Sequence, residues 1–171
     1  RVILIDSNKS FIQEALDSDI EAFKVDVYDD ELANNIELND VGYLIALTGS
    51  DQVNMHALNK FSENFGEQGA YKLASSKEIT EASDSDRESF FTPHDDYINL
   101  SEAYRENPII NEVNISNQKE YNSLLEVLSK EEKSIPLFVE NKQGIYLLPE
   151  FEKNKFAKED ITLFYLGKVV N

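Results

Sequence analysis

Residues 43–66 read YLIALTGSDQVNMHALNKFSENFG, and this stretch decides the predicted fold. Residues 43–47 are almost continuously apolar, which is typical of a strand covered on both faces in a parallel sheet. A polar turn at 48–50 follows, and apolar residues then recur at the spacing of one helix face. The pattern predicts a buried strand over 43–48 and an amphipathic helix over 51–65. Polar groups at such a turn lie at the carboxyl edge of a sheet, where open α/β folds bind their ligands.

The ends of this predicted helix carry suitable residues. Ser50 is a suitable N-cap, and Asp51 places a carboxylate in the first turn, where it complements the helix dipole. Gly66 stands where the end of a helix favours a left-handed residue. The inward stripe is expected to contain Val53, Ala57, Leu58, Phe61 and Phe65.

Residues 1–75 repeat the pattern of a strand followed by a helix. Further strands are predicted at 1–6, 22–27 and 70–74, and further helices at 9–18 and 29–38. The first helix is expected to turn Phe11, Ile12, Ala15 and Leu16 inward. Alternating strands and helices imply a parallel sheet, so we expect an α/β domain over 1–75.

The remaining residues follow a different pattern. Residues 76–91 are rich in Ser, Asp and Glu, which indicates a linker. Beyond it the sequence predicts helices at 98–105 and 118–130 and strands at 109–115, 135–139, 144–148 and 160–166. The two middle strands form a hairpin signal, with Gly144 available for a positive φ. We therefore expect a small α+β domain with antiparallel strands over 92–171.

Charge and composition exclude several classes of function. The net charge of −17 disfavours nucleic acid, whose phosphates need clustered Lys and Arg, and also disfavours anionic lipid surfaces. There is no cysteine, and no apolar run approaches the ~20 residues that a membrane span needs. His56 and His94 are far apart in sequence, and His56 is expected on the exposed side of its helix, so no metal site is predicted.

No catalytic motif is present. The sequence lacks a G-x-S-x-G elbow, a Walker lysine after a glycine loop, and any Tyr-x-x-x-Lys pair. We therefore expect a protein that is not an enzyme.

Polar residues follow two of the predicted strands. Asp6, at the end of the first strand, could accept hydrogen bonds from a ribose, as the acidic residue of a dinucleotide fold does. The glycine loop that should precede it by about 20 residues is absent, and a helix-capping role is equally consistent. The group Thr48, Gly49, Ser50, Asp51 and Asn54 could bind an anion or hydroxyl at a helix N-terminus, or could simply cap the helix.

The motif IALTGSDQVNMHAL at 45–58 resembles the ALT-x-x-D-x-x-N stretch of the Trk potassium-uptake N-terminal (TrkA-N) domain, also called the regulator-of-K⁺-conductance nucleotide-binding domain. In that family the stretch follows an acidic strand end like VILIDSN at 2–8. Residues 1–75 and IPLFVENKQGIYLL at 135–148 are more closely similar to the cytoplasmic C-terminal region of NhaP-like sodium:proton antiporters. These motifs cover about half of the chain.

The resemblance implies a Rossmann-like regulatory domain that binds a nucleotide, often NAD or AMP, and controls a membrane ion transporter from the cytoplasmic side. The implied partners are the transmembrane antiporter portion of the same polypeptide and a second copy in a homodimer. Asp6 would accept from the ribose, and Asp26 would lie near the adenine. The implied cofactor-binding residues are Asp6, Ser7, Asn8, Asp26, Thr48, Gly49, Ser50, Asp51 and Asn54. Thr48, Asp51 and Asn54 would line the far side of the cleft or brace the loop.

Two departures from the family pattern bear on binding. Val25 stands where a glycine usually precedes the second acid, so the backbone cannot approach a ligand as closely. The family's first strand and glycine loop are missing, and the sequence begins at Arg1 directly before the apolar run 2–5. We therefore expect a piece of a longer protein that does not bind NAD tightly by itself.

The absent strand would lie between the Asp6 strand and the Tyr43 strand in the usual order, and its loss exposes two edges. Direct pairing of these strands, a strand from the second domain, or dimerisation could repair the gap, and we expect one of the last two. Two other functions stay open. One is a soluble NAD(P)-dependent oxidoreductase fragment, and the other is an interaction module that has lost nucleotide binding.

Overall fold

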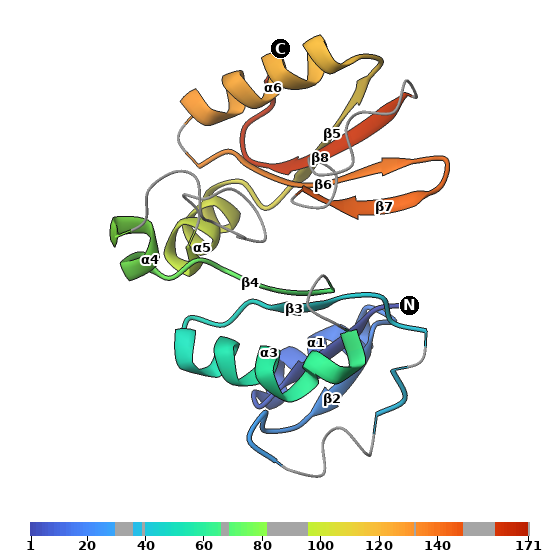
Figure 1. The fold of residues 1–171 in the computed structure, drawn as a ribbon, viewed down its shortest axis with the longest axis vertical. Helices are drawn as coiled ribbons and strands as arrows, with labels where there is room; N and C mark the ends of the chain where they lie inside the picture. Colours follow the sequence, from blue (N-terminus) through green and yellow to red (C-terminus); the bar gives the residue numbers. More distant parts are fainter. Residues whose placement is uncertain are drawn as a thin grey trace. The chain divides into compact units, whose positions relative to one another are not determined.

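The computed structural model describes residues 1–29, 36–38, 40–65, 69–81, 96–131, 133–148 and 160–170 (Figure 1). The chain divides into two compact units, Arg1–Lys72 and Leu73–Asn171. Unit 1 contains parallel strand pairs, whereas the sheet of unit 2 is antiparallel. The predicted mixture of a parallel α/β part and an antiparallel α+β part is confirmed.

The first half of unit 1 is a strand–helix–strand motif. Strand β1 (Ile3–Asp6) pairs in parallel with β2 (Glu21–Lys24), and helix α1 (Lys9–Asp17) connects them. The prediction that α1 turns four apolar residues inward is wrong for two of them. Ile12 and Ala15 are buried, whereas Phe11 is 54% exposed and Leu16 is 47% exposed. The helix covers one narrow pair of strands, so only the centre of its apolar stripe finds a surface to pack on.

The second half of unit 1 confirms the strand–turn–helix at its centre. Strand β3 (Leu44–Ala46) precedes α3 (Asp51–Phe65) and pairs in parallel with β4 (Ala70–Lys72). All three strands that were expected at 22–27, 43–48 and 70–74 are present but shorter, because regular pairing stops before the predicted ends.

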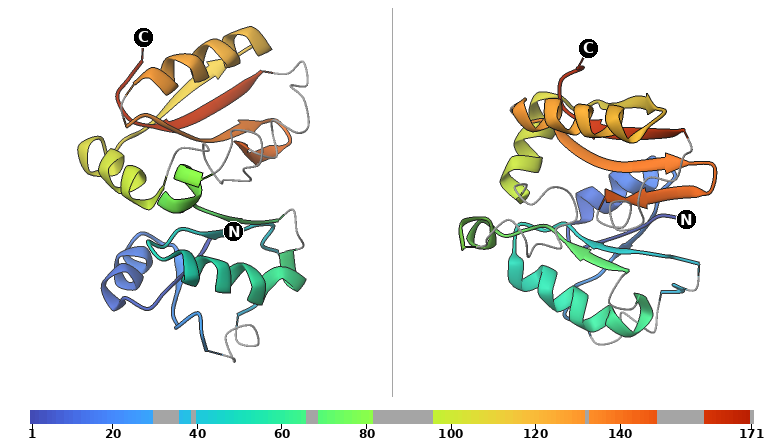
Figure 2. Two further views of the ribbon diagram at one scale, coloured as in Figure 1. Left: turned by 60° about the vertical axis from the view of Figure 1, so that its left-hand side comes forward. Right: turned by 45° about the horizontal axis from the view of Figure 1, so that its top comes forward.

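One hydrophobic cluster beside α3 contains side chains from both strand pairs. Phe61 of α3 is 4% exposed, and it packs in one cluster with side chains of β1, β2 and β3. These neighbours include Ile3, Ile5, Phe23, Val25 and Leu44. Successive strand residues point to opposite faces, so the face of the β1–β2 pair that meets α3 is opposite the one that α1 covers. Helices α1 and α3 flank the strands on two sides (Figures 1 and 2).

The strands of unit 1 form two separate pairs. Among the described residues, β1 pairs only with β2 and β3 pairs only with β4. The two strands are not paired with each other, and neither pairs with a described strand of unit 2. Of the two repairs that we expected, a strand from the second domain is not found among the described residues, whose four remaining strands form their own antiparallel sheet. Dimerisation stays a prediction.

The described residues of unit 2 form a four-stranded sheet with one covering helix and two further helices. Its helices are α4 (Ser76–Glu81), α5 (Tyr97–Glu106) and α6 (Gln118–Lys130). Its strands β5 (Ile110–Ile115), β6 (Ile135–Asn141), β7 (Gly144–Leu147) and β8 (Ile161–Leu166) lie in the order β5-β8-β6-β7. Tyr121 and Leu128 of α6 pack on Val139, Leu163 and Tyr165 of the sheet. The predicted hairpin is confirmed, and Gly144 has a φ of 149°.

Some predictions concern residues outside the described ranges. The linker expected over 76–91 contains α4, and residues 82–91 lie outside the described part. Gly66, His94 and most of the helix expected at 29–38 also lie outside it. No helix in the described ranges combines the length and the apolar character that crossing a bilayer requires.

Candidate functional site

Strands β1 and β3 each begin a parallel strand–helix–strand pair, and the two pairs are not hydrogen-bonded to each other. A parallel strand–helix–strand connection is almost always right-handed, so helices on opposite faces of a sheet belong to connections that run in opposite directions. Helix α1 connects β1 to β2 on one face, and α3 connects β3 to β4 while packing on the other. The carboxyl ends of β1 and β3 therefore flank a topological switch point, the place where open α/β sheets bind ligands.

Asp6 is the last residue of β1 at this edge. Its Oδ1 accepts a hydrogen bond from the backbone N–H of Asn8 at 2.7 Å. Asn8 in turn caps α1, because its Oδ1 accepts from the N–H of Ser10 at 2.9 Å. The helix-capping role that the sequence left open for Asp6 is thus taken by Asn8. The ribose role of Asp6 stays a prediction, and its second carboxylate oxygen has no hydrogen-bond partner among the described residues. Ser7, between them, is exposed.

Asp26 follows the neighbouring strand and forms the same type of turn. Its Oδ1 accepts from the N–H of Tyr28 at 3.0 Å. Directly before it, the N–H of Val25 donates to the carbonyl of Asp6 at 3.1 Å, so the end of β2 stays bound to the end of β1. The structure therefore places two carboxylates, Asp6 and Asp26, after adjacent parallel strands.

Thr48 and Asn54 form a closed network after β3. Asn54 is only 2% exposed, and its Oδ1 accepts from the N–H of Thr48 at 3.0 Å and from its hydroxyl at 2.7 Å. The side-chain amide of Asn54 donates back to the carbonyl of Thr48 at 2.9 Å. Because these groups are used on each other, the pair braces the turn.

Ser50 and Asp51 complete the start of α3. The N–H of Val53 donates to the Ser50 hydroxyl at 3.4 Å, a long capping bond. Asp51 accepts from the ammonium of Lys72, at the end of β4, at 2.9 Å. Gly49 is exposed between these groups. The expected polar group at 48–54 is thus assembled in one turn, and Lys72 is a member that the sequence did not reveal.

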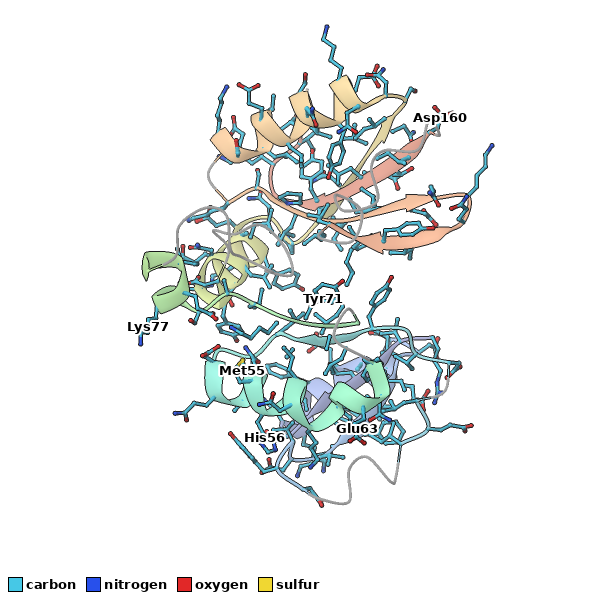
Figure 3. All side chains as sticks on the ribbon, viewed as in Figure 1. Met55, His56, Glu63, Tyr71, Lys77 and Asp160 are labelled. Carbon is cyan, nitrogen blue, oxygen red and sulfur yellow. The ribbon has the colours of Figure 1, made fainter. Side chains whose placement is uncertain are left out.

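Two side chains of α3 hold the loop that follows β2. The ammonium of Lys60 donates to the carbonyl oxygens of Val27, at 3.1 Å, and Asp29. The ring of His56, whose position on α3 is labelled in Figure 3, lies against that of Tyr28, with 4.5 Å between the ring centroids. The prediction that His56 is exposed is wrong, because it is half-buried and its Nε2 is shielded from solvent. No spacing in the sequence indicates these contacts, which depend on the packing of α3 across β2.

These groups fit one half of a dinucleotide better than the other. Two ionised carboxylates can accept hydrogen bonds from the hydroxyls of a ribose. A pyrophosphate needs an open helix N-terminus, but the Asn8 side chain caps α1 and an acidic residue stands in the first turn of α3. Within the described ranges, no group of three or more His, Cys, Asp or Glu side chains could hold a metal ion. The described site is therefore suited to an adenosine ribose and lacks a cradle for phosphate.

Comparison with known proteins gives an independent result. The family model of the TrkA-N domain matches residues 1–91, which is more than half of the 171-residue chain. The match includes the turns that follow β1 and β2, with Asp6 and Asp26, and the turn between β3 and α3. A search of curated proteins found no match. On the extent of the family match, the chain belongs to the TrkA-N domain family.

Proposed function

We propose that this chain is a cytoplasmic regulatory domain of a monovalent cation:proton antiporter, which senses an adenine nucleotide such as NAD or AMP. Membership of the TrkA-N family supports the coarser part, because these domains are regulatory or NAD-binding domains of K⁺-transport systems. The antiporter part follows the resemblance of 1–75 and 135–148 to NhaP-like proteins. The chain is not an enzyme in this proposal, and its role is to report ligand binding.

The observation that carries the proposal is the geometry of Asp6. Its carboxylate lies at the end of β1, beside the switch point, and the N–H of Asn8 fixes one of its oxygens. A preorganised acceptor loses little conformational entropy when it binds a hydroxyl. Asp26 repeats this geometry one strand away. The pair is therefore suited to recognise the ribose and adenine side of a nucleotide.

The open edges of β1 and β3 support a second part of the proposal. Each strand has one unpaired edge among the described residues, and their exposed backbone groups are ready to pair with another strand. Ile45 and Leu47 of the β3 segment are 37% and 39% exposed, which leaves that face of the strand uncovered. We propose that a further parallel strand, carrying the glycine loop, fills the gap in the complete polypeptide and supplies the missing phosphate cradle.

Transport measurements test the regulatory role. The complete polypeptide, in vesicles with a pH-sensitive dye inside, should exchange Na⁺ or K⁺ for protons at a rate that depends on added NAD or AMP. The Asp6→Asn variant should still transport but should lose the nucleotide response. Absence of cation:proton exchange would contradict the antiporter assignment, and a nucleotide response unchanged in Asp6→Asn would contradict the proposed site.

One alternative is favoured by a specific observation. The capped α1 and the acidic first turn of α3 leave no open helix N-terminus at this edge, and Val25 restricts backbone approach. An interaction module that self-associates without a nucleotide is consistent with these features. Sedimentation of the complete polypeptide with and without AMP separates the two functions, since only the sensing domain changes its behaviour with the nucleotide.

A further inference from the structure

Lys60 of α3 holds the main chain that follows β2. Its ammonium donates to the carbonyl oxygen of Val27 at 3.1 Å and to that of Asp29. Both acceptors belong to the backbone, so the two hydrogen bonds fix the course of the main chain whatever side chains stand there. Residues 27–29 therefore form an anchored segment, which is tied to the helix at its first and last carbonyl groups.

The anchored segment supplies the hydrogen bonds of the Asp26 turn. The N–H of Tyr28, between the two carbonyl groups that Lys60 binds, donates to Asp26 Oδ1 at 3.0 Å. The N–H of Asp29 donates to the Asp26 carbonyl at 2.9 Å. Asp26 itself is exposed to solvent. Its carboxylate is therefore held in place by the anchored segment, and a shift of that segment would release it.

His56 makes a second contact from the same face of α3. It precedes Lys60 by four residues, the spacing at which helical side chains lie one above the other. Its ring centroid lies 4.5 Å from that of Tyr28, while its shielded Nε2 has no hydrogen-bond partner among the described residues. His56 therefore supports the anchored segment by ring packing, whereas Lys60 supports it by hydrogen bonds.

The same helix also braces the neighbouring turn. Asn54 is 2% exposed and is joined to Thr48 by three hydrogen bonds. Helix α3 thus holds the turn after β3 near its own start, and it holds the anchored segment about one to two helical turns further along. The positions of Thr48 and of the Asp26 carboxylate are therefore set by one helix.

We infer that Lys60 is a positioning residue for nucleotide recognition, which acts through Asp26 by anchoring the segment that supplies the hydrogen bonds of its turn. The inference rests on the proposed function, in which Asp6 and Asp26 recognise the ribose and adenine side of the nucleotide. An acceptor that is already fixed loses little conformational entropy on binding. A lysine that only stabilised the loop would not change the affinity through Asp26, and this difference can be measured.

The anchoring is tested first, without any nucleotide. Nitrogen-15 relaxation of the 171-residue chain gives backbone order parameters, which are about 0.85 for rigid backbone and fall below about 0.6 for flexible backbone. In Lys60→Met the order parameters at 27–29 should fall towards the flexible value, while those of β1 should stay unchanged. Met55→Ala is the control on the same helix, because Met55 is 41% exposed, and it should keep the wild-type values.

The recognition role is tested by calorimetric titration of the complete polypeptide with AMP. Lys60→Met should weaken AMP binding by about two- to tenfold, the lower part of the range for residues that share one network. In an Asp26→Asn background the same substitution should cause no further loss, because its effect passes through Asp26. Lys130→Met is the matched control, since it removes the same charge from α6 of unit 2, and it should leave the affinity unchanged.

Each contrary result would overturn the inference. Order parameters at 27–29 that stay rigid in Lys60→Met, or that fall equally in Met55→Ala, would show that Lys60 does not anchor the segment. Equal losses of affinity from Lys60→Met with and without Asp26, or from Lys130→Met, would show a general effect of charge or stability. AMP binding that Asp26→Asn weakens and Lys60→Met does not would refute the inference and leave the proposed function intact. A complete polypeptide that binds no AMP would refute the proposed function, and the recognition role of Lys60 with it.

Discussion

Asn54 and Thr48 are joined by three hydrogen bonds across the β3–α3 turn, and Asn54 uses both ends of its side-chain amide in them. The sequence suggested these residues as cleft-lining groups or as a brace for the loop. The burial of Asn54 and its hydrogen bonds to Thr48 give the pair a bracing role, while Asp6 and Asp26 keep acceptors at the edge of the sheet. The described site thus combines a hydrogen-bonded turn after β3 with carboxylate acceptors after β1 and β2.

Replacing Asn54 by Ala should destabilise unit 1 by about 1–3 kcal/mol, because the buried amide of Asn54 no longer bonds the N–H and carbonyl of Thr48. Thermal unfolding followed by circular dichroism measures the loss. Gln52→Ala, an exposed position in the same turn of the helix, is the control and should be close to neutral. Equal effects of the two substitutions would contradict the bracing role.

Phe61→Ala should destabilise unit 1 by about 3–5 kcal/mol, the usual cost of removing a buried aromatic ring. Phe61 lies in the cluster that joins β1, β2 and β3, so both strand pairs should loosen together. Hydrogen exchange of β1 and β3 amides reports this. Met55→Ala on the same helix is the control, because Met55 is 41% exposed (Figure 3). Loss of protection in only one strand pair would contradict a shared core.

Acid should weaken unit 1 through a charge cluster around Arg1. Hydrogen bonds from the Arg1 guanidinium lower the pKa of Glu21 and of Asp40 below their ordinary values. A carboxylate with a lowered folded-state pKa contributes stability above its unfolded-state pKa, and that contribution disappears as the pH falls through the folded-state value. Unfolding midpoints of wild type and Glu21→Gln should therefore differ at about pH 6 and converge below about pH 3. A constant difference across this range would exclude the ionised pair as its source.

Gly167→Ala should destabilise unit 2 by about 1–3 kcal/mol, because the residue has a φ of 135° that L side chains rarely adopt. An added Cβ would also lie 2.6 Å from the Ser134 hydroxyl oxygen and 2.8 Å from its Cα. Denaturant unfolding measures the effect. Gly42→Ala is the control, since its added Cβ would have no neighbour within 4 Å. A neutral Gly167→Ala would show that the tail after β8 can move away.

Within the described ranges, the sequence predicted the strand–helix order of unit 1 and the helices and strands of unit 2 other than α4, because hydrophobic periodicity depends on which face of an element is buried. It predicted Gln118–Lys130 with both ends correct, since Asn117 caps this helix and its apolar stripe is regular. It did not predict the exposure of Phe11 and Leu16, which depends on how much sheet lies beneath α1. Nor did it predict Lys60 and Lys72, whose partners are 21 to 33 residues away and are set by tertiary packing.

Calorimetric titration with AMP, NAD and NADH tests the central claim most directly. The account predicts no micromolar binding to the 171 residues alone and micromolar binding to the complete polypeptide. Asp6→Asn should weaken that binding by about tenfold or more, as expected for loss of a charged hydrogen bond, whereas Asp160→Asn on unit 2 should not. Micromolar binding to the 171 residues alone, or binding to the complete polypeptide that Asp6→Asn leaves unchanged, would contradict the account.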